Sequence, residues 1–375
     1  MNWELIVSDD ALAQKLDSVA GCETVMVDTE FMRRDTFYPQ IALLQLCFVG
    51  SGENEKTAWL IDPLAISDLS PLIDLLTDPA VLKVLHSASE DLEVFMQWLG
   101  VVPTPMFDTQ RAAAVLDRGF GLGYRALVQS ICDVDLPKGE TRSNWLKRPL
   151  TEAQCEYAGL DVTWLLPVWR ELHAASVDAG KLAWVLADGE DAASAMGSVQ
   201  VDYYKRVKTA WKLNPEALGR LQAVCQWREV EARERDRPRS WIIDDKACLQ
   251  LAIEAPEDES ALRAIELPPS VHRRYAQRLL ELIEQQGWVP ESELPARLPG
   301  PLEAAQRDRL KRLKAQARQI AQGLDVAPEY LLAAKDYELL IRQAEGATIV
   351  PPKPWAGWRE AAVVEPLQAF LRGEK

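Results

Sequence analysis

The stretch Val25-Met26-Val27-Asp28-Thr29-Glu30-Phe31 decides how this chain folds and what it does. Its apolar, β-branched start is typical of a buried strand. Side chains alternate along a strand, so the carboxylates of Asp28 and Glu30 leave the same face. Two adjacent anions repel, and removing each from water unpaired costs several kcal/mol. A divalent cation solves both problems, because hard cations such as Mg²⁺ take oxygen ligands. The alternative is a strand that ends at Val27, with both acids facing water.

Size and composition are those of a globular protein with two or three domains, at 375 residues, 48% hydrophobic and 26% charged. No uncharged apolar run reaches the length of a membrane span, so we expect no membrane partner. The start Met-Asn-Trp-Glu-Leu-Ile-Val-Ser-Asp-Asp lacks the features of a signal peptide. Six scattered cysteines without a Cys-x-x-Cys pair indicate reduced thiols. These features predict a cytoplasmic protein.

The net charge of −15 is unevenly distributed. Residues 211–375 hold 25 basic and 26 acidic side chains, which leaves 17 and 31 for residues 1–210. The excess acid therefore lies in the half that carries the proposed metal site. The overall charge neither supports nor excludes a polyanionic substrate.

Strand and helix patterns alternate in the first half of the chain. Apolar, β-branched runs predict strands at residues 25–31, 41–49, 57–62, 81–86 and 103–108. Helical periodicity and capping residues predict helices at 67–76, 89–99, 109–116, 124–132 and 151–172. This order indicates an α/β domain, a mixed sheet with helices on both faces.

From about residue 210 the patterns are helical, and prolines and glycines separate them. We expect amphipathic helices at residues 215–235, 246–253, 269–285, 301–323 and 328–344. Pro290, Pro295 and Pro299 indicate a linker between two small all-α domains. The predicted domains are therefore residues 1–208, 209–291 and 292–375.

Two further acids complete a candidate site. Asp91 lies near the start of a predicted helix, where a carboxylate also suits the helix dipole. Tyr157 and Asp161 are four residues apart and share one helix face. Four converging carboxylates could hold two divalent cations about 3.5–4 Å apart, which stabilise the attacking and leaving oxygens of a phosphoryl displacement. A tyrosine hydroxyl could orient the attacking water. The alternative for Asp91 is the helix-dipole role alone, and the alternative for Asp161 and Tyr157 is an ordinary solvated acid with a half-buried tyrosine.

The sequence resembles a known family at these positions. Asp28-Thr-Glu-Phe, His86-Ser-Ala-Ser-Glu-Asp-Leu and Tyr157-Ala-Gly-Leu-Asp-Val resemble the three exonuclease motifs of the DEDD superfamily, tyrosine branch. Within that branch the chain is similar to the bacterial ribonuclease D family, and the likeness extends through residues 107–110 and 138–150. It covers about the first half, while the second half is similar to paired HRDC domains. The resemblance implies a ribonuclease H-like sheet followed by two HRDC-like helical domains.

The resemblance also implies roles for individual residues. Asp28, Glu30, Asp91 and Asp161 become ligands of two Mg²⁺ or Mn²⁺ ions, and Tyr157 becomes the group that orients the water. Four residues become candidate contacts of the substrate, through base stacking, hydrogen bonding or phosphate binding, and each has an alternative as a core or solvated loop residue: Phe31, His86, Lys138 and Arg142.

The function implied is a metal-dependent 3′–5′ exoribonuclease. It would shorten structured RNAs such as tRNA precursors and release 5′-mononucleotides, as a monomer without a nucleotide cofactor. Gly119-Phe-Gly-Leu-Gly lacks the pattern of a nucleotide loop and instead predicts a turn that opens a helix. Two alternatives remain open: a 3′–5′ exonuclease acting on DNA, and a catalytically inert RNA-binding protein on the same fold.

Overall fold

The computed structural model describes residues 2–50, 57–196 and 202–373 and divides the chain into two compact units. The first comprises Met1–Met32, Gln40–Gly197 and Leu302–Lys375. The second comprises Arg33–Pro39 and Ser198–Pro301. The predicted division at residues 208 and 291 differs from this one, because residues 302–375 are grouped with the α/β region. The three-domain division stays a prediction.

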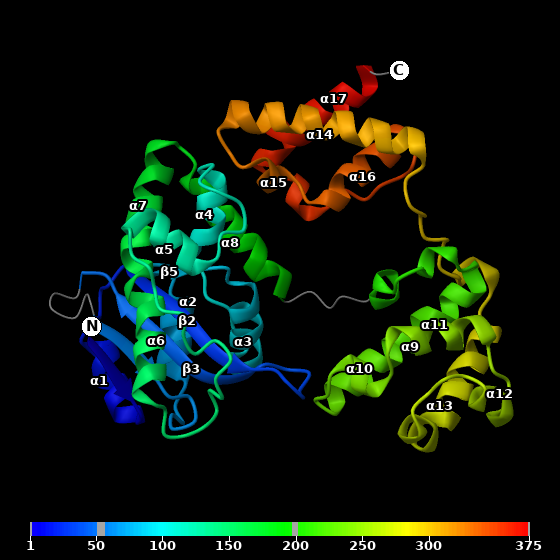
Figure 1. The fold of residues 1–375 in the computed structure, drawn as a ribbon, viewed down its shortest axis with the longest axis horizontal. Coiled ribbons are helices and arrows are strands. Elements are labelled where there is room, and N and C mark those ends of the chain that lie inside the picture. The colour runs from blue at the N-terminus through cyan, green and yellow to red at the C-terminus, as the bar shows by residue number, and fades with distance from the viewer. Residues whose placement is uncertain (1, 51–56, 197–201, 374–375) are drawn as a thin grey trace. The chain divides into compact units, whose positions relative to one another are not determined.

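A six-stranded mixed sheet forms the centre of the first unit, in the order β1-β4-β3-β2-β5-β6 (Figure 1). β3 runs antiparallel to both β2 and β4, and the other neighbours are parallel. β2 therefore lies inside the sheet, where both of its edges are hydrogen-bonded. The strands are β1 (Asn2–Ile6), β2 (Thr24–Met32), β3 (Gln40–Phe48), β4 (Thr57–Ile61), β5 (Leu82–Leu85) and β6 (Met106–Asp108).

Helices cover both faces of this sheet, which confirms the predicted fold class. Alternation along β2 sends Val25 and Val27 to one apolar cluster and Met26 to another. The first cluster includes residues of α1 (Asp9–Asp17), α2 (Ser70–Thr77) and α3 (Ser89–Leu99). The second includes residues of α4 (Thr109–Val115), α5 (Tyr124–Cys132), α6 (Glu152–Thr163), α7 (Leu165–Asp178) and α8 (Leu182–Met196).

Three features of this unit differ from the predictions. Residues 151–172 form two helices, because Pro167 lacks an N–H and its ring excludes the carbonyl of residue 163 from a continuous helix. The strand β1 was not predicted. The helix α8 was also not predicted. It contains Gly189, where a Cβ would lie 2.4 Å from the carbonyl oxygen of Met106 on β6. That glycine lets α8 pack closely on the sheet edge.

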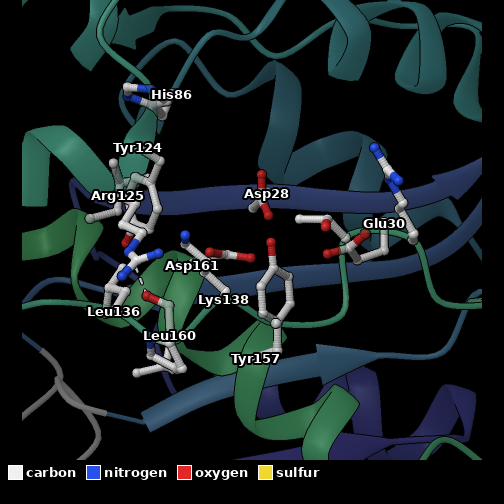
Figure 2. Close-up of a pocket in the computed structure, with 15 residues that line it drawn as sticks. Asp28, Glu30, His86, Tyr124, Arg125, Leu136, Lys138, Tyr157, Leu160 and Asp161 are labelled. Atoms are coloured by element: carbon white, nitrogen blue, oxygen red, sulfur yellow. Dashed lines mark hydrogen bonds between the residues drawn. The ribbon is translucent and has the colours of Figure 1, made fainter.

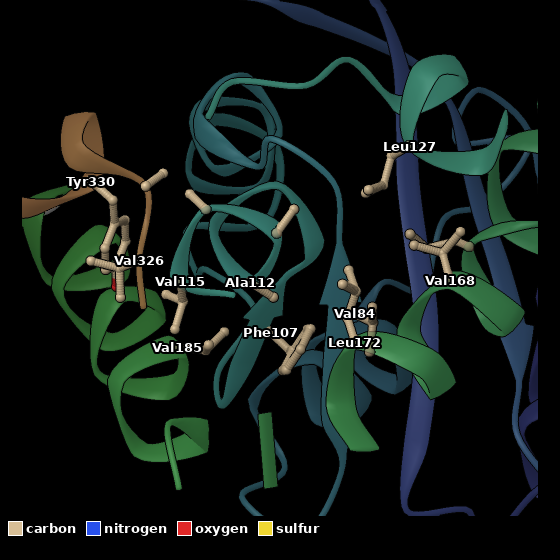
Figure 3. Close-up of a cluster of buried hydrophobic side chains, with 14 of the residues drawn as sticks. Val84, Phe107, Ala112, Val115, Leu127, Val168, Leu172, Val185, Val326 and Tyr330 are labelled. Carbon is tan, nitrogen blue, oxygen red and sulfur yellow. The ribbon is translucent and has the colours of Figure 1, made fainter. Parts of the chain in front are cut away.

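The C-terminal helices pack against the α/β region within the first unit. Figure 3 shows Val326 and Tyr330 beside Val115 and Val185. The backbone N–H of Ala327 donates to the carbonyl of Ala114 at 2.9 Å. The helices are α14 (Ala304–Leu324), α15 (Pro328–Leu331), α16 (Ala334–Ala344) and α17 (Glu365–Gly373). The single helix predicted at residues 328–344 was wrong, because the backbone of Leu332 is extended.

The second unit is helical and has a core of its own. Its helices are α9 (Pro215–Glu234), α10 (Arg239–Ile242), α11 (Asp245–Glu254), α12 (Glu259–Arg263) and α13 (Pro269–Gly287). Of the tryptophans in this region, Trp227 is buried, whereas Trp211, Trp241 and Trp288 are 40%, 59% and 81% exposed. They lie in short turns or at helix ends, where helical periodicity gives no information about burial.

No helix in the described part of the chain has an apolar stretch long enough to span a membrane.

Candidate active site

β2 places Asp28 and Glu30 on the face of the sheet that α6 covers. They follow Met26 on that face, and they pair across the strands with Gln45 and Leu43 of β3. The register shifts between Glu30 and Phe31, so the regular ladder ends directly after the second acid. Both carboxylates therefore stand at the end of a buried row of side chains, and neither is in full contact with water.

The third carboxylate comes from α6. This helix begins with a capping box, in which the Thr151 hydroxyl accepts from the N–H of Gln154 and the Gln154 side chain accepts from the N–H of Thr151. Asp161 lies one turn after Tyr157, and both side chains point toward β2 (Figure 2). One oxygen from each of Asp28, Glu30 and Asp161 lies within 4.8 Å of the other two.

Asp91 approaches from α3, on the other side of β2. Its Oδ1 accepts a hydrogen bond of 2.5 Å from the Thr29 hydroxyl, and Thr29 alternates with the two acids of the strand. Asp91 is buried, and its charge contributes to the raised pKa values of Asp28 and Glu30. The group of oxygens within 4.8 Å contains the other three acids and not Asp91. Its place as a fourth ligand stays a prediction.

Burial and mutual repulsion favour the protonated forms of these acids. Burial is the main cause that raises the pKa of Glu30 to about 9 and the pKa of Asp28 well above its usual value, and Asp161 adds to both shifts. Burial also raises the pKa values of Asp91 and Asp161 to about 7. Burial thus disfavours the ionised form of each of the four acids, as expected where carboxylates are grouped to bind a cation.

These residues fit a divalent cation. All candidate donors are carboxylate oxygens, which Mg²⁺ and Mn²⁺ prefer. The charges that act on Asp28 and Glu30 are those of other carboxylates. A bound cation would remove this repulsion and restore the ionised forms. The chemistry of the donor set and its geometry therefore agree with a divalent cation.

An open cavity of about 540 Å³ lies over the carboxylates. Asp28, Glu30, Tyr157 and Asp161 line it together with three of the predicted substrate contacts, His86, Lys138 and Arg142. Lys138 and Arg142 are exposed, so their charges are available to an anionic ligand. His86 places Nδ1 3.0 Å from the Thr109 hydroxyl, and burial lowers its pKa. The cavity is thus acidic at its floor and basic at one wall.

Tyr157 is held in this cavity by its neighbours. Its ring lies 6.0 Å from that of the buried Trp145, and a Cβ at Gly139 would lie only 2.2 Å from Tyr157 Cδ2. Glycine at position 139 therefore lets the loop close over the tyrosine. Burial, followed by the charge of Asp161, raises the pKa of Tyr157 further above neutrality, so its hydroxyl keeps its proton.

Tyr124 and Arg125 are among the cavity-lining residues that the sequence did not indicate. Tyr124 donates to the carbonyl of Leu160 at 2.9 Å, and Arg125 donates to Asp135. The sequence feature that could have indicated them is their position in the first turn of α5, directly after the predicted glycine turn. In that turn Gly119 and Gly121 have φ of +125° and +65°.

Some residues considered from the sequence have other surroundings. Phe31 is half-buried and is not among the described residues that line the cavity, so its contact with a base stays a prediction. Arg148, in the segment 138–150, donates to both oxygens of Asp62 and to the carbonyl of Ala42, so other parts of the protein hold its guanidinium group.

Comparison with known proteins identifies the fold and the family. A family model described as a 3′–5′ exonuclease matches residues 4–175, and one described as an HRDC domain matches residues 217–283. Ribonuclease D of Pseudomonas paraeruginosa is 42% identical over 358 residues, which cover 94% of this chain and 93% of the relative. Ribonuclease D of Escherichia coli K12 is 33% identical and covers 99% of both chains.

The fold agrees as well. The crystal structure of Escherichia coli RNase D, described as an exoribonuclease involved in structured RNA processing, superposes with a TM-score of 0.90 at 33% identity. The match covers 100% of this chain and 99% of that one. The chain therefore belongs to the ribonuclease D family of 3′–5′ exoribonucleases, and it is a hydrolase of that class.

Proposed function

We propose that this enzyme shortens structured RNAs such as tRNA precursors from the 3′ end by hydrolysis with two divalent cations, Mg²⁺ or Mn²⁺, and releases 5′-mononucleotides. The observation that carries the proposal is the group of three carboxylates, Asp28, Glu30 and Asp161, at the floor of a cavity with a basic wall. The polymer is supported by the similarity to a relative described as acting on structured RNA.

We assign the metal-ligand role to Asp28, Glu30, Asp91 and Asp161. When bound, the cations supply Lewis-acid stabilisation of the attacking and leaving oxygens. The four acids come from β2, α3 and α6, so the packing of both helices on the sheet sets their spacing. Ligands on regular elements hold their geometry better than ligands on loops.

Tyr157 would orient the attacking water. Its raised pKa keeps the hydroxyl protonated, so it both donates and accepts hydrogen bonds near neutral pH. It lies one helical turn from Asp161, which brings the water position and the metal ligand to the same face of α6. No serine, cysteine or histidine nucleophile is needed for this reaction.

The basic wall would hold the RNA backbone. Lys138 and Arg142 are exposed at the cavity, and phosphate contacts of this kind position a nucleic acid without reading its sequence. His86 lines the same cavity and would contact the terminal nucleotide. We further propose that the enzyme is monomeric and cytoplasmic. Sedimentation of the purified chain and fractionation of cells expressing it would test these two points.

The test is a time course on a 5′-labelled tRNA with a short 3′ extension, with Mg²⁺ or Mn²⁺ and with chelator. Wild type should give a ladder that shortens from the 3′ end only when metal is present. Asp28→Asn should be slower by about 10³-fold, because losing a metal ligand costs several kcal/mol of transition-state stabilisation.

Asp178→Asn is the matched control, since it removes one carboxylate charge from an exposed position on α7. It should retain wild-type activity. Chelator-resistant digestion, or full activity of Asp28→Asn, would contradict the metal-site assignment. A matched DNA strand digested as fast as the RNA would instead favour a DNA exonuclease.

A further inference from the structure

Gln45 is a buried glutamine in the middle of β3, directly beside Asp28. The strand register pairs Gln45 with Asp28 of β2 on one side and with Leu60 of β4 on the other. Residues paired in this way project from the same face of a sheet, with Cβ atoms about 4.5–5.5 Å apart. The register shift of β2 comes later, after Glu30, so it leaves this pair intact.

The surroundings of Gln45 leave its side-chain amide without a partner. The residue is 0% exposed, and neither Nε2 nor Oε1 has a hydrogen-bond partner in the described part of the chain. Buried polar groups in native proteins nearly always have one, because losing water without replacement is unfavourable. The neighbours on the same face belong to the apolar core: Met26, Leu43, Cys47 and Leu60.

The carboxylate of Asp28 is therefore the polar group next to the Gln45 amide within the sheet. A carboxylate has about four lone-pair positions, so Asp28 can bind a cation and still accept an N–H from behind. Gln45 is not among the described residues that line the cavity, whereas Asp28 is. Any effect of Gln45 on the reaction must then pass through Asp28 and not through direct contact with RNA.

We propose that Gln45 is a positioning residue: in the cation-bound enzyme its side-chain N–H, which is unpaired in this structure, donates to the neighbouring Asp28 carboxylate and holds it in the orientation that binds the cation. The inference rests on the proposed metal-ligand role of Asp28. Groups that orient a metal ligand typically change metal affinity or activity by about 10- to 100-fold when they are removed.

The test uses the full chain and Mn²⁺ alone, with the rise in melting temperature giving the apparent dissociation constant. Gln45→Met replaces the amide by an apolar side chain of similar length, and Gln45→Leu is a second apolar variant in case the first is misfolded. Leu43→Met is the matched control, because Leu43 is equally buried on the same face and pairs with Glu30. RNA cleavage provides kcat and KM.

For Gln45→Met we expect Mn²⁺ affinity to fall by about 10- to 100-fold and kcat to fall at limiting Mn²⁺. The KM for RNA should stay unchanged. The metal-free melting temperature should not fall, because replacing an unpaired buried amide by an apolar group removes no hydrogen bond. Leu43→Met should bind Mn²⁺ like wild type.

Two results would overturn the proposal. One contradicts only the role of Gln45, and the other also contradicts the proposed metal site. If wild type is stabilised by Mn²⁺, Asp28→Asn is not, and Gln45→Met matches wild type, the role of Gln45 is wrong and the metal site stands. If Mn²⁺ does not stabilise wild type, the metal site itself is wrong, and the role of Gln45 fails with it.

Discussion

Two acidic regions of this protein have opposite electrostatics. In the first unit, burial and neighbouring carboxylates raise the pKa values of Asp28 and Glu30. In the second unit, Glu229 is 5% exposed, and burial alone would raise its pKa, but Arg239 and Arg233 outweigh burial and lower it. Removal from water raises the pKa in both regions, so it does not distinguish them. The two regions differ in that arginines lie beside Glu229, whereas the charged groups that act on Asp28 and Glu30 are other acids.

In the second unit, arginine side chains supply the positive charge that pairs with Glu229. Both Glu229 oxygens accept from Arg239, at 2.5 and 2.9 Å, and Arg233 donates at 2.9 Å. The two guanidinium groups also lie over the ring of Phe37, at 4.6 and 4.8 Å. Glu229 is thus a structural acid, whereas no basic side chain is among the causes that shift the pKa values of Asp28 and Glu30, which we propose bind metal ions.

Removing the charge of Glu229 should have the largest effect on stability. Glu229→Gln leaves two arginines without their buried partner, so the free energy of unfolding should fall by about 3 kcal/mol in urea denaturation. Because the pKa of Glu229 is lowered, its contribution is present above the unfolded pKa and is lost as pH falls through the folded pKa. An unchanged unfolding midpoint at pH 7 would show that the ion pairs contribute nothing.

Tyr157→Phe should affect rate and not metal binding. The variant keeps the ring between Trp145 and Gly139 and removes only the hydroxyl. If the hydroxyl orients water, kcat should fall by about 10²-fold, with the KM for RNA and the Mn²⁺-induced rise in melting temperature unchanged. Single-turnover kinetics and thermal melts measure these separately. A lost Mn²⁺ response would place Tyr157 among the metal-binding groups instead.

Lys138→Gln and Arg142→Gln should have the smallest effects. Each removes one exposed charge at the cavity, so KM should rise a few-fold at low salt and kcat should be retained. The slope of log affinity against log salt should become shallower by about 0.7 per lost phosphate contact with a single strand. If these charges instead neutralised the acids, the variants would lose metal-free stability and leave the salt dependence intact.

The sequence predicted the parts of the structure that depend on local pattern. Alternation in β2 placed Asp28 and Glu30 on one face, and the four-residue spacing placed Tyr157 and Asp161 on one helix face. The convergence of these two pairs depends on how α6 crosses the sheet, which no local pattern contains. It was expected from family resemblance only.

Other features required three-dimensional neighbours. Asp188 accepts from Tyr330 and Arg359, which follow it by more than 140 residues, so the docking of the C-terminal helices could not be foreseen. Gln45 appears in the sequence as one polar residue in an apolar strand. Only the register shows that it lies beside Asp28.

The most direct test is the melting temperature of the metal-free protein as pH rises from 5 to 9, for wild type and Asp28→Asn, repeated with Mn²⁺. The folded pKa values of about 7 for Asp161 and about 9 for Glu30 exceed the ordinary value near 4, so the folded state binds more protons than the unfolded state in this window. Stability of the metal-free wild type should therefore fall with rising pH relative to Asp28→Asn, and Mn²⁺ should reverse the difference. Equal pH dependence of the two proteins, with no effect of Mn²⁺ on wild type, would contradict the account.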